Sequence, residues 1–410
     1  MSSREPAPPT GQGETVAAAI RDGTLRRPSP AAPSFVDLVC AVQRAAGAST
    51  PATAHSGALA GYLFDRPHLV LVLVDGMGMS ALADPEVADL RERVGMELDS
   101  VFPATTACAM TTVATGLWPG QHGVPGWWAY LSEHDLPVTV LPFEERRNGR
   151  GLRRHDVPVR DIWPHPSRFG EVAGGMELHM PWKYLLSTFN RYLSGRCRTR
   201  GYWSLRHAQR RILRRVQAAR GRRAESSVTF WYIPDYDSTC HTYGVASAEA
   251  RASLRQIRDL LQELAARAPD DVRVAVTADH GLIDLGEGDR APLFDGDPLL
   301  DCLLSMPSGE GRTPHFHVRP GMDRELVERL VERAGGRMAV LSQGEADELR
   351  LFGPEPLSEF ARRRFGDYVG IALAPFTLAY FPSADSTSLR HVGVHGGMCP
   401  AEVRVPLVVL

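Results

Sequence analysis

The chain has 410 residues, which is enough for two domains of ordinary size or for one large α/β domain with insertions. Hydrophobic residues make up 43% and charged residues 23%, so wholesale disorder is excluded. The net charge of -2 argues against a protein whose main task is to coat a nucleic-acid polymer or a membrane surface. No apolar run approaches the roughly 20 residues that a membrane-spanning helix needs, which excludes a transmembrane protein.

The amino-terminal segment and the cysteines both favour a reducing compartment. Residues 1–34 are rich in Pro, Ala, Ser and Gly, which predicts a disordered tail. They lack the basic start and the apolar stretch of a secretion signal. The six cysteines are scattered without a CxxC pair, which disfavours a disulfide framework or a cysteine zinc cluster. We therefore expect a cytoplasmic protein.

From residue 35 onward, helix and strand patterns alternate. Apolar residues at helical spacing predict a helix over 35–46. Continuous apolar runs of strand length follow at 68–74, 227–233 and 272–277, with a helical pattern over 248–267. Runs of this kind are typical of central strands that are buried on both faces. The alternation predicts an α/β fold with a mostly parallel central sheet and helices on both faces.

Two segments interrupt this alternation. Residues 127–200 carry many aromatic and arginine residues, which favours an insertion over the site. The arginines continue over 196–223 at helical spacing, a pattern that is most often a solvated helix face. Residues 285–365 form a second, peripheral region. The predicted organisation is therefore a catalytic domain over 35–410 with these two additions.

Polar side chains follow each predicted strand at the point where it ends. Because the carboxyl ends of parallel strands meet at one edge of a sheet, these side chains can meet in space. Carboxylates and imidazoles are ligands for zinc and similar divalent ions. The candidates are Asp75, Asp237, His241, Asp279, His280 and, near the carboxyl terminus, His395. Asp237 and His241 are four positions apart, which places both on one face if that segment is helical.

These ligands suffice for two ions. Two ions about 4 Å apart can clamp the attacking and leaving oxygens of an in-line displacement at phosphorus. A hydroxyl beside an ion loses its proton readily and becomes a nucleophile. The stretch FPATTACAMTT over 102–112 offers that hydroxyl at Thr105 or Thr106.

Taken in order, these motifs resemble the alkaline phosphatase superfamily and, within it, the type I phosphodiesterase/nucleotide pyrophosphatase family. The resemblance spans residues 69–410 and rests on six motifs: Asp75-Gly after a strand, Phe-Pro-x-Thr-Thr, ATGLWPGQHG over 114–123, Asp237-x-x-x-His241, Asp279-His280-Gly and His395-Gly-Gly. It implies an alkaline-phosphatase-like fold with a smaller inserted cap region. Residues 400–409 resemble the closing edge strand of that fold.

The resemblance also implies roles for individual residues. Asp75, Thr106, Asp279 and His280 match the ligands of the metal on the nucleophile side, and Asp237, His241 and His395 match those of the other metal. The expected ions are two Zn²⁺, with Mn²⁺ compatible with the same ligands. Thr106 matches the nucleophile when residues are counted back from Thr115-Gly116, with Thr105 as its rival. The implied mechanism is a double displacement through a covalent phospho-threonine.

The activity that follows from the resemblance is hydrolysis of a phosphodiester or pyrophosphate bond in a nucleotide-like small molecule. Alternatives on the same core are a phosphomonoesterase or phosphomutase, for which the sequence shows no cation around a terminal phosphate, and a phosphonate hydrolase. A non-catalytic, metal-stabilised binding protein is the alternative of another class. Ala109 stands where many nucleotide pyrophosphatases have Asn, which bears on the substrate class. The usual sulfatase signature is absent, since Cys108 is followed by Ala-Met.

Several residues compete with the candidates or extend them. Asp235 competes with Asp237 but lacks the four-residue spacing to His241, and His391 competes with His395, which precedes two glycines. We interpret His122 as a turn histidine bonded to backbone. Aromatic side chains that either stack on a nucleobase or fill the core of the insertion are Trp127, Trp128 and Tyr130.

Overall fold

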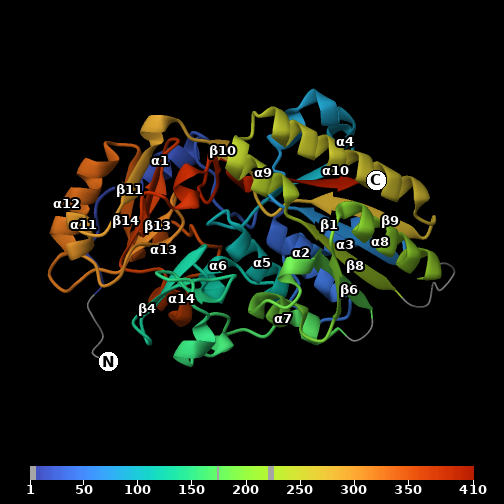
Figure 1. Cartoon of the computed structure of the whole chain (residues 1–410), viewed down its shortest axis with the longest axis horizontal. Helices are drawn as coiled ribbons and strands as arrows, with labels where there is room; N and C mark the ends of the chain where they lie inside the picture. The colour runs from blue at the N-terminus through green and yellow to red at the C-terminus, as the bar shows by residue number, and fades with distance from the viewer. Residues whose placement is uncertain (1–5, 173–174, 220–225) are drawn as a thin grey trace.

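The computed structural model describes residues 6–172, 175–219 and 226–410. Over this part of the chain, two separate sheets with their helices lie side by side (Figure 1). No described helix has both the length and the apolar character of a membrane span. The helices are α1 (Gly13–Arg21), α2 (Phe35–Ala45), α3 (Ser56–Leu63), α4 (Ala88–Glu92), α5 (Thr106–Thr115), α6 (Pro119–His122), α7 (Thr188–Ser194), α8 (Leu205–Ala219), α9 (Asp235–Tyr243), α10 (Ala248–Arg267), α11 (Pro298–Asp301), α12 (Asp323–Ala334), α13 (Gln343–Glu348), α14 (Glu359–Arg364) and α15 (Pro400–Val403).

The main sheet is mostly parallel, as the sequence predicts. Seven strands of the described chain lie in the order β2-β18-β9-β1-β8-β6-β7, and those from β9 to β7 run parallel. Their bounds are β1 (His68–Val74), β2 (Val94–Asp99), β6 (Met176–Pro181), β7 (Arg198–Tyr202), β8 (Ser227–Ile233), β9 (Val272–Thr277) and β18 (Arg404–Val409). The predicted strands over 68–74, 227–233 and 272–277 and the predicted helix over 248–267 are confirmed to the residue.

Helices cover both faces of this sheet, and the side chains of its central strands are almost all buried. Phe230 of β8 points toward α2 and α5, with which it lines one small cavity. The next side chain back along β8 points the other way, since side chains alternate in a strand. That side chain, Thr229, accepts a hydrogen bond from Arg215 of α8 at 3.0 Å. Helix α8 in turn packs on α10, where Gln209 donates to the carbonyl of Leu260.

The second sheet joins the two segments that the sequence pattern suggests are separate additions. Its order is β14-β15-β13-β12-β3-β4-β5, and its described pairs are all antiparallel. Its strands are β3 (Trp128–Leu131), β4 (Leu136–Thr139), β5 (Glu144–Glu145), β12 (Ser308–Gly309), β13 (Pro314–Phe316), β14 (Met338–Ser342) and β15 (Tyr368–Ala372). Two short pairs stand apart: β10 (Ile283–Asp284) with β17 (Gly393–Val394), and β11 (Arg290–Leu293) with β16 (Thr377–Tyr380).

The predicted boundaries of the insertion need correction. The segment 127–200 is not one inserted unit, because its last part supplies β6 and β7 of the main sheet. Residues 400–409 do not form an edge strand either. The first part of that segment is helix α15, and β18 then lies inside the main sheet, antiparallel to both β2 and β9. Because β18 pairs with β2 on one side and with β9 on the other, β2 is the edge strand at this end of the main sheet.

The predicted tail over 1–34 is wrong for its described part, which begins at Pro6. Helix α1 packs against β14, and Val16 of α1 is fully buried. Gln12 accepts a hydrogen bond from the backbone of Val340, and Arg26 forms an ion pair with Asp99. Composition misled here because small residues suit close packing as well as they suit disorder.

Val16 gives a test of this contact. Val16→Asp is expected to lower the free energy of unfolding by about 1–3 kcal/mol, because it buries a charge without a partner. The matched control is Thr15→Asp, at an exposed position in the first turn of α1 where a negative charge is tolerated. Thermal unfolding and limited proteolysis would report the difference. Equal behaviour of the two variants would contradict the packing of α1.

Candidate active site

The first cluster of candidate ligands forms where β1 and β9 end side by side. Asp75 follows β1, and Asp279 and His280 follow β9. Their ligand atoms lie within 4.8 Å of one another, and all three residues are buried. The Nε2 atom of His280 is 3.4 Å from an oxygen of Asp75 and 3.6 Å from an oxygen of Asp279. The hydroxyl of Thr106 completes this cluster, 3.2 Å from His280 Nε2 and 3.4 Å from each Asp75 oxygen.

The second cluster stands on helix α9 and on the segment that follows β17. The helix begins directly after β8, so Asp237 and His241 lie on one face, with His241 Nε2 3.3 Å from Asp237 Oδ2. His395 approaches from the carboxyl-terminal segment, 4.0 Å from the other oxygen of Asp237. The ligand atoms of these three residues also lie within 4.8 Å of one another. The rings of His280 and His395 stack at 3.9 Å, so the two clusters adjoin.

The three histidines share one arrangement. In each ring Nδ1 lies against a backbone carbonyl oxygen: Gly393 for His241 at 2.7 Å, Gly281 for His280 at 3.1 Å and Ala104 for His395 at 3.1 Å. A proton on Nδ1 satisfies each carbonyl and leaves the Nε2 lone pair facing the carboxylates. Protein ligands of metal ions are oriented in this way by a backbone partner.

The carboxylates of the two clusters are crowded and incompletely satisfied. Burial, with Asp279 and Asp237 nearby, raises the pKa of Asp75 well above its ordinary value, and burial also raises the pKa of Asp279. One oxygen of Asp237 and one of Asp279 are buried without a hydrogen-bond partner among the described residues. Buried oxygens of this kind are costly unless a cation or a donor meets them.

Helix α5 gives the two threonines that the sequence leaves open different surroundings. Thr105 is its N-cap and Thr106 its first residue. The Thr105 hydroxyl does not cap the helix but donates to Glu310 Oε1 at 2.6 Å. Of the two threonines, only Thr106 therefore presents its hydroxyl to the first cluster. The amide groups of the first turn of α5 lie beside it, where helix geometry favours a bound anion.

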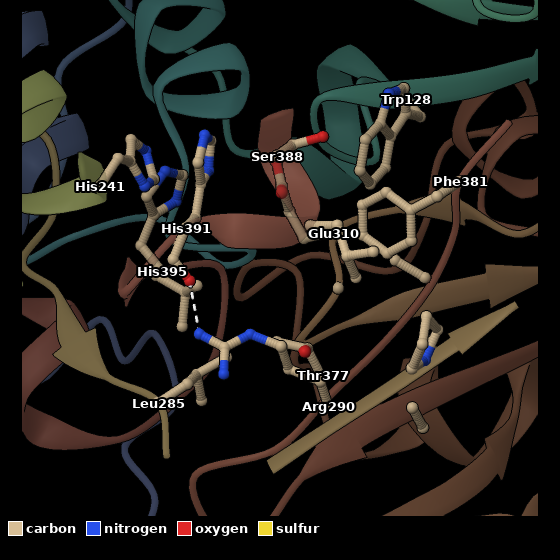
Figure 2. A pocket seen from close by; sticks show the side chains of 16 residues that line it. Trp128, His241, Leu285, Arg290, Glu310, Thr377, Phe381, Ser388, His391 and His395 are labelled. Carbon is tan, nitrogen blue, oxygen red and sulfur yellow. Dashed lines mark hydrogen bonds between the residues drawn. The ribbon is translucent and has the colours of Figure 1, made fainter. Parts of the chain in front are cut away.

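A pocket opens beside the second cluster. Its walls are His241, His391 and His395 on one side and Trp128 and Phe381 on another, as Figure 2 shows. The floor comes from the paired strands β11 and β16, which contribute Arg290 and Thr377. The second sheet and the neighbouring pair thus supply most of the pocket, while the main sheet supplies the acidic clusters.

The structure separates the aromatic candidates. Trp128 lines the pocket, with the guanidinium of Arg146 on its ring at 3.8 Å. Trp127 packs against the main core and donates its backbone N–H to Glu310 at 2.7 Å. Tyr130 is buried and donates its hydroxyl to Asp135, so it belongs to the core of the insertion and not to the pocket.

The remaining alternatives fall outside the two clusters. Asp235 is exposed. His391 stacks on His241 at 4.4 Å and lines the pocket without joining the ligand set. His122 is bonded to backbone as predicted, but it is the last residue of helix α6: it accepts the N–H of Val124, and burial lowers its pKa to about 3. Ala109 is fully buried in α5.

Two residues that sequence reasoning missed support the site. Tyr232, near the end of β8, donates its hydroxyl to Asp75, and its place next to a strand end was a usable signal. Glu310 lies in the turn between β12 and β13 and holds both Thr105 and Trp127. Burial raises the pKa of Glu310 to about 7. No local sequence pattern indicates its role, because its partners lie far away in the chain.

Comparison with known proteins agrees with this architecture. Residues 69–397 match the model of the family described as type I phosphodiesterase/nucleotide pyrophosphatase. Comparison with curated proteins gives no sequence match. Among solved structures, murine ectonucleotide pyrophosphatase/phosphodiesterase 5 is similar, with 16% identity and a TM-score of 0.60 over 83% of this chain and 87% of that one. An inactive variant of that protein in complex with AMP gives 15% identity and a TM-score of 0.59 over the same shares.

A bacterial structure is also similar. Phosphonoacetate hydrolase from Sinorhizobium meliloti 1021, in complex with phosphonoacetate, gives 19% identity and a TM-score of 0.57 over 83% of this chain and 89% of that one. At such identities these likenesses show the alkaline-phosphatase-like fold alone. The family match, by contrast, covers most of the chain. The chain is therefore a phosphoester hydrolase that belongs to the type I phosphodiesterase/nucleotide pyrophosphatase family.

Proposed function

We propose that the chain hydrolyses phosphodiester or pyrophosphate bonds in a nucleotide-like small molecule, with Thr106 as nucleophile and two divalent ions, Zn²⁺ in the first place, as cofactors. The observation that carries the proposal is the position of the Thr106 hydroxyl, 3.2 Å from His280 Nε2 at the first cluster. Thr105, its rival in the sequence, is engaged by Glu310.

The residues of both clusters fit divalent ions. Each cluster offers carboxylate oxygens and histidine Nε2 atoms, which are donors that zinc prefers. The orphaned oxygens of Asp237 and Asp279 are explained if each meets a cation. We assign Asp75, Thr106, Asp279 and His280 to one ion and Asp237, His241 and His395 to the other. When bound, such ions supply positive charge that favours the Thr106 alkoxide and stabilises the departing oxygen.

The chain's own groups then account for a double displacement. The Thr106 hydroxyl loses its proton to water and Oγ1 attacks phosphorus, so that an O–P bond forms while the bond to the leaving-group oxygen breaks and the leaving group departs as an anion that takes up a proton from water. The resulting phospho-threonine ester is hydrolysed by water, which restores the Thr106 hydroxyl. The N-terminus of α5 faces the phosphoryl oxygens and favours their negative charge. Glu310 keeps Thr105 and Trp127 in place beside the reacting group.

A paired turnover assay tests the proposal. Zinc-loaded protein is expected to hydrolyse bis-p-nitrophenyl phosphate at least about tenfold faster than p-nitrophenyl phosphate, and EDTA is expected to abolish both activities. Metal analysis of the dialysed protein is expected to give two ions per chain, and Asp237→Asn is expected to give one. A preference for the monoester would favour a phosphatase, and turnover in EDTA would contradict the metal assignment.

A further inference from the structure

The pocket beside the second cluster contains a positively charged side chain that has no role in the proposed reaction. Arg290, in β11, lines the pocket together with His241, His391 and His395. If the second ion stabilises the departing oxygen, this pocket receives the leaving group. The inference that follows therefore rests on the proposed function and specifies its substrate class.

Arg290 is held in a fixed orientation by backbone groups. One terminal nitrogen donates to the carbonyl of Gly286 at 2.7 Å and the other to the carbonyl of His391 at 2.6 Å. The second of these bonds is drawn in Figure 2. A guanidinium carries five N–H groups, so these two bonds leave others available for a ligand. Orientation before binding reduces the entropy lost when a ligand binds.

The charge of Arg290 has no carboxylate partner within the described part of the chain. The neighbouring acid, Asp289, accepts a hydrogen bond from the backbone of Gly286 and lies 3.9 Å from Arg337 instead. Arg333 of α12, by contrast, pairs with Asp297 at 3.0 Å. A half-buried, oriented and unpaired guanidinium in a pocket is suited to an anionic ligand, since hydrogen bonds to charged groups are the strong ones.

The opposite wall of the pocket would contact the rest of the leaving group. Trp128 and Phe381 present aromatic surface (Figure 2), and one face of the Trp128 ring is covered by Arg146. Glu310 also lines the pocket, and in its ionised form it disfavours an anion close to it. Arg290 therefore offers a place for a negative charge on the leaving group, away from Glu310.

From this geometry we propose that Arg290 is a specificity-determining residue that recognises a carboxylate or phosphate on the leaving group. The chain then prefers substrates whose leaving group is itself anionic over substrates with a neutral leaving group. The two sources of that charge, a carboxylate and a second phosphate, share the same chemistry and are separated by the substrates of the test.

The test compares three thymidine 5′-phosphate substrates that differ only in the leaving group: 4-carboxyphenol, its neutral methyl ester, and methyl phosphate. Arg290→Gln is expected to lower kcat/KM about 10- to 100-fold on the two anionic substrates and less than about threefold on the neutral one. Whichever anionic substrate loses more identifies the source of the charge. Salt is expected to reduce the wild-type preference for anions and to leave the variant unaffected.

The matched control is Arg390→Gln, which removes the same charge one residue before His391. The Arg390 side chain is 70% exposed and does not line the pocket, so all three rates are expected to change less than about threefold. Arg290→Lys, which keeps the charge, is expected to recover part of the preference, and thermal unfolding of each variant checks folding. An equal loss on all three substrates, or a loss confined to the neutral one, would overturn the assignment of Arg290. A wild-type protein that cleaves none of the three would instead refute the proposed function.

Discussion

Thr106→Ala is expected to lower kcat on a diester substrate by roughly 10³-fold or more, because it removes the atom that forms the bond to phosphorus. Thr106→Ser keeps a hydroxyl on the same carbon and is expected to retain measurable turnover. In wild-type protein, acid quenching during turnover should trap a nucleotidyl group on the peptide that contains residue 106, which mass spectrometry would detect. No such adduct is expected in the alanine variant.

The matched control is the same substitution one position earlier. Thr105 donates its hydroxyl to Glu310 and does not touch the first cluster, so Thr105→Ala is expected to cost about tenfold through loss of positioning. Metal content should be measured in both variants, since Thr106 is also an assigned ligand. A larger loss of kcat for Thr105→Ala than for Thr106→Ala would mean that Thr105, and not Thr106, is the nucleophile. Retention of full activity by Thr106→Ala would contradict the proposed phospho-threonine intermediate.

The main sheet could be predicted from the sequence because the burial of its strands is visible in their amino-acid composition. Strands β1, β8 and β9 are buried on both faces, so each appears as a mostly apolar run that is followed within two residues by an aspartate. The parallel arrangement then brings the strand ends to one edge. For this reason the amino-acid sequence alone suffices to group Asp75, Asp237 and Asp279.

The second sheet could not be read in this way. Its strands are two to five residues long, too short to show a period, and they pair across long separations: Gly309 of β12 pairs with Trp128 of β3. The predicted tail failed for a related reason, because the partner of Thr10 is the carbonyl of Val340, 330 positions away. Glu310 reaches Thr105 over 205 positions. Local patterns cannot indicate contacts of this kind, and the pocket is made from them.

A buried ion pair connects this second sheet to the second cluster. Arg312 lies in the same turn as Glu310 and forms two parallel bonds with Glu402, at 2.7 and 2.9 Å. Both side chains are fully buried, with 1% and 0% exposure. Glu402 also accepts the N–H of Gly397 at 2.8 Å, and Thr313 donates to the carbonyl of Gly396. The segment directly after His395 is thus fixed by groups on the second sheet and on α15.

Glu402→Leu is expected to lower the free energy of unfolding by about 3–5 kcal/mol, because it leaves the Arg312 guanidinium buried without its counter-ion. It is also expected to weaken metal binding at the second cluster, since the backbone N–H of Gly397 loses its acceptor and the segment that carries His395 is released. Urea unfolding and metal analysis would measure the two effects separately. Glu328→Leu is the matched control, because Glu328 pairs with Arg324 where the side chains are 68% and 91% exposed. That change is expected to cost less than about 1 kcal/mol.

The double variant Arg312→Met/Glu402→Leu distinguishes the effect of an unpaired buried charge from the effect of losing the acceptor of the Gly397 N–H. Removing both charges is expected to recover most of the lost stability, because a buried ion pair is often replaced by apolar residues at little cost. It cannot restore the acceptor of Gly397, so weakened metal binding is expected to persist. Recovery of both properties would mean that the pair disturbs the site only through its unpaired charge. Recovery of neither would mean that Arg312 holds the turn through its bonds to the carbonyls of Ala374 and Phe376, and not through Glu402.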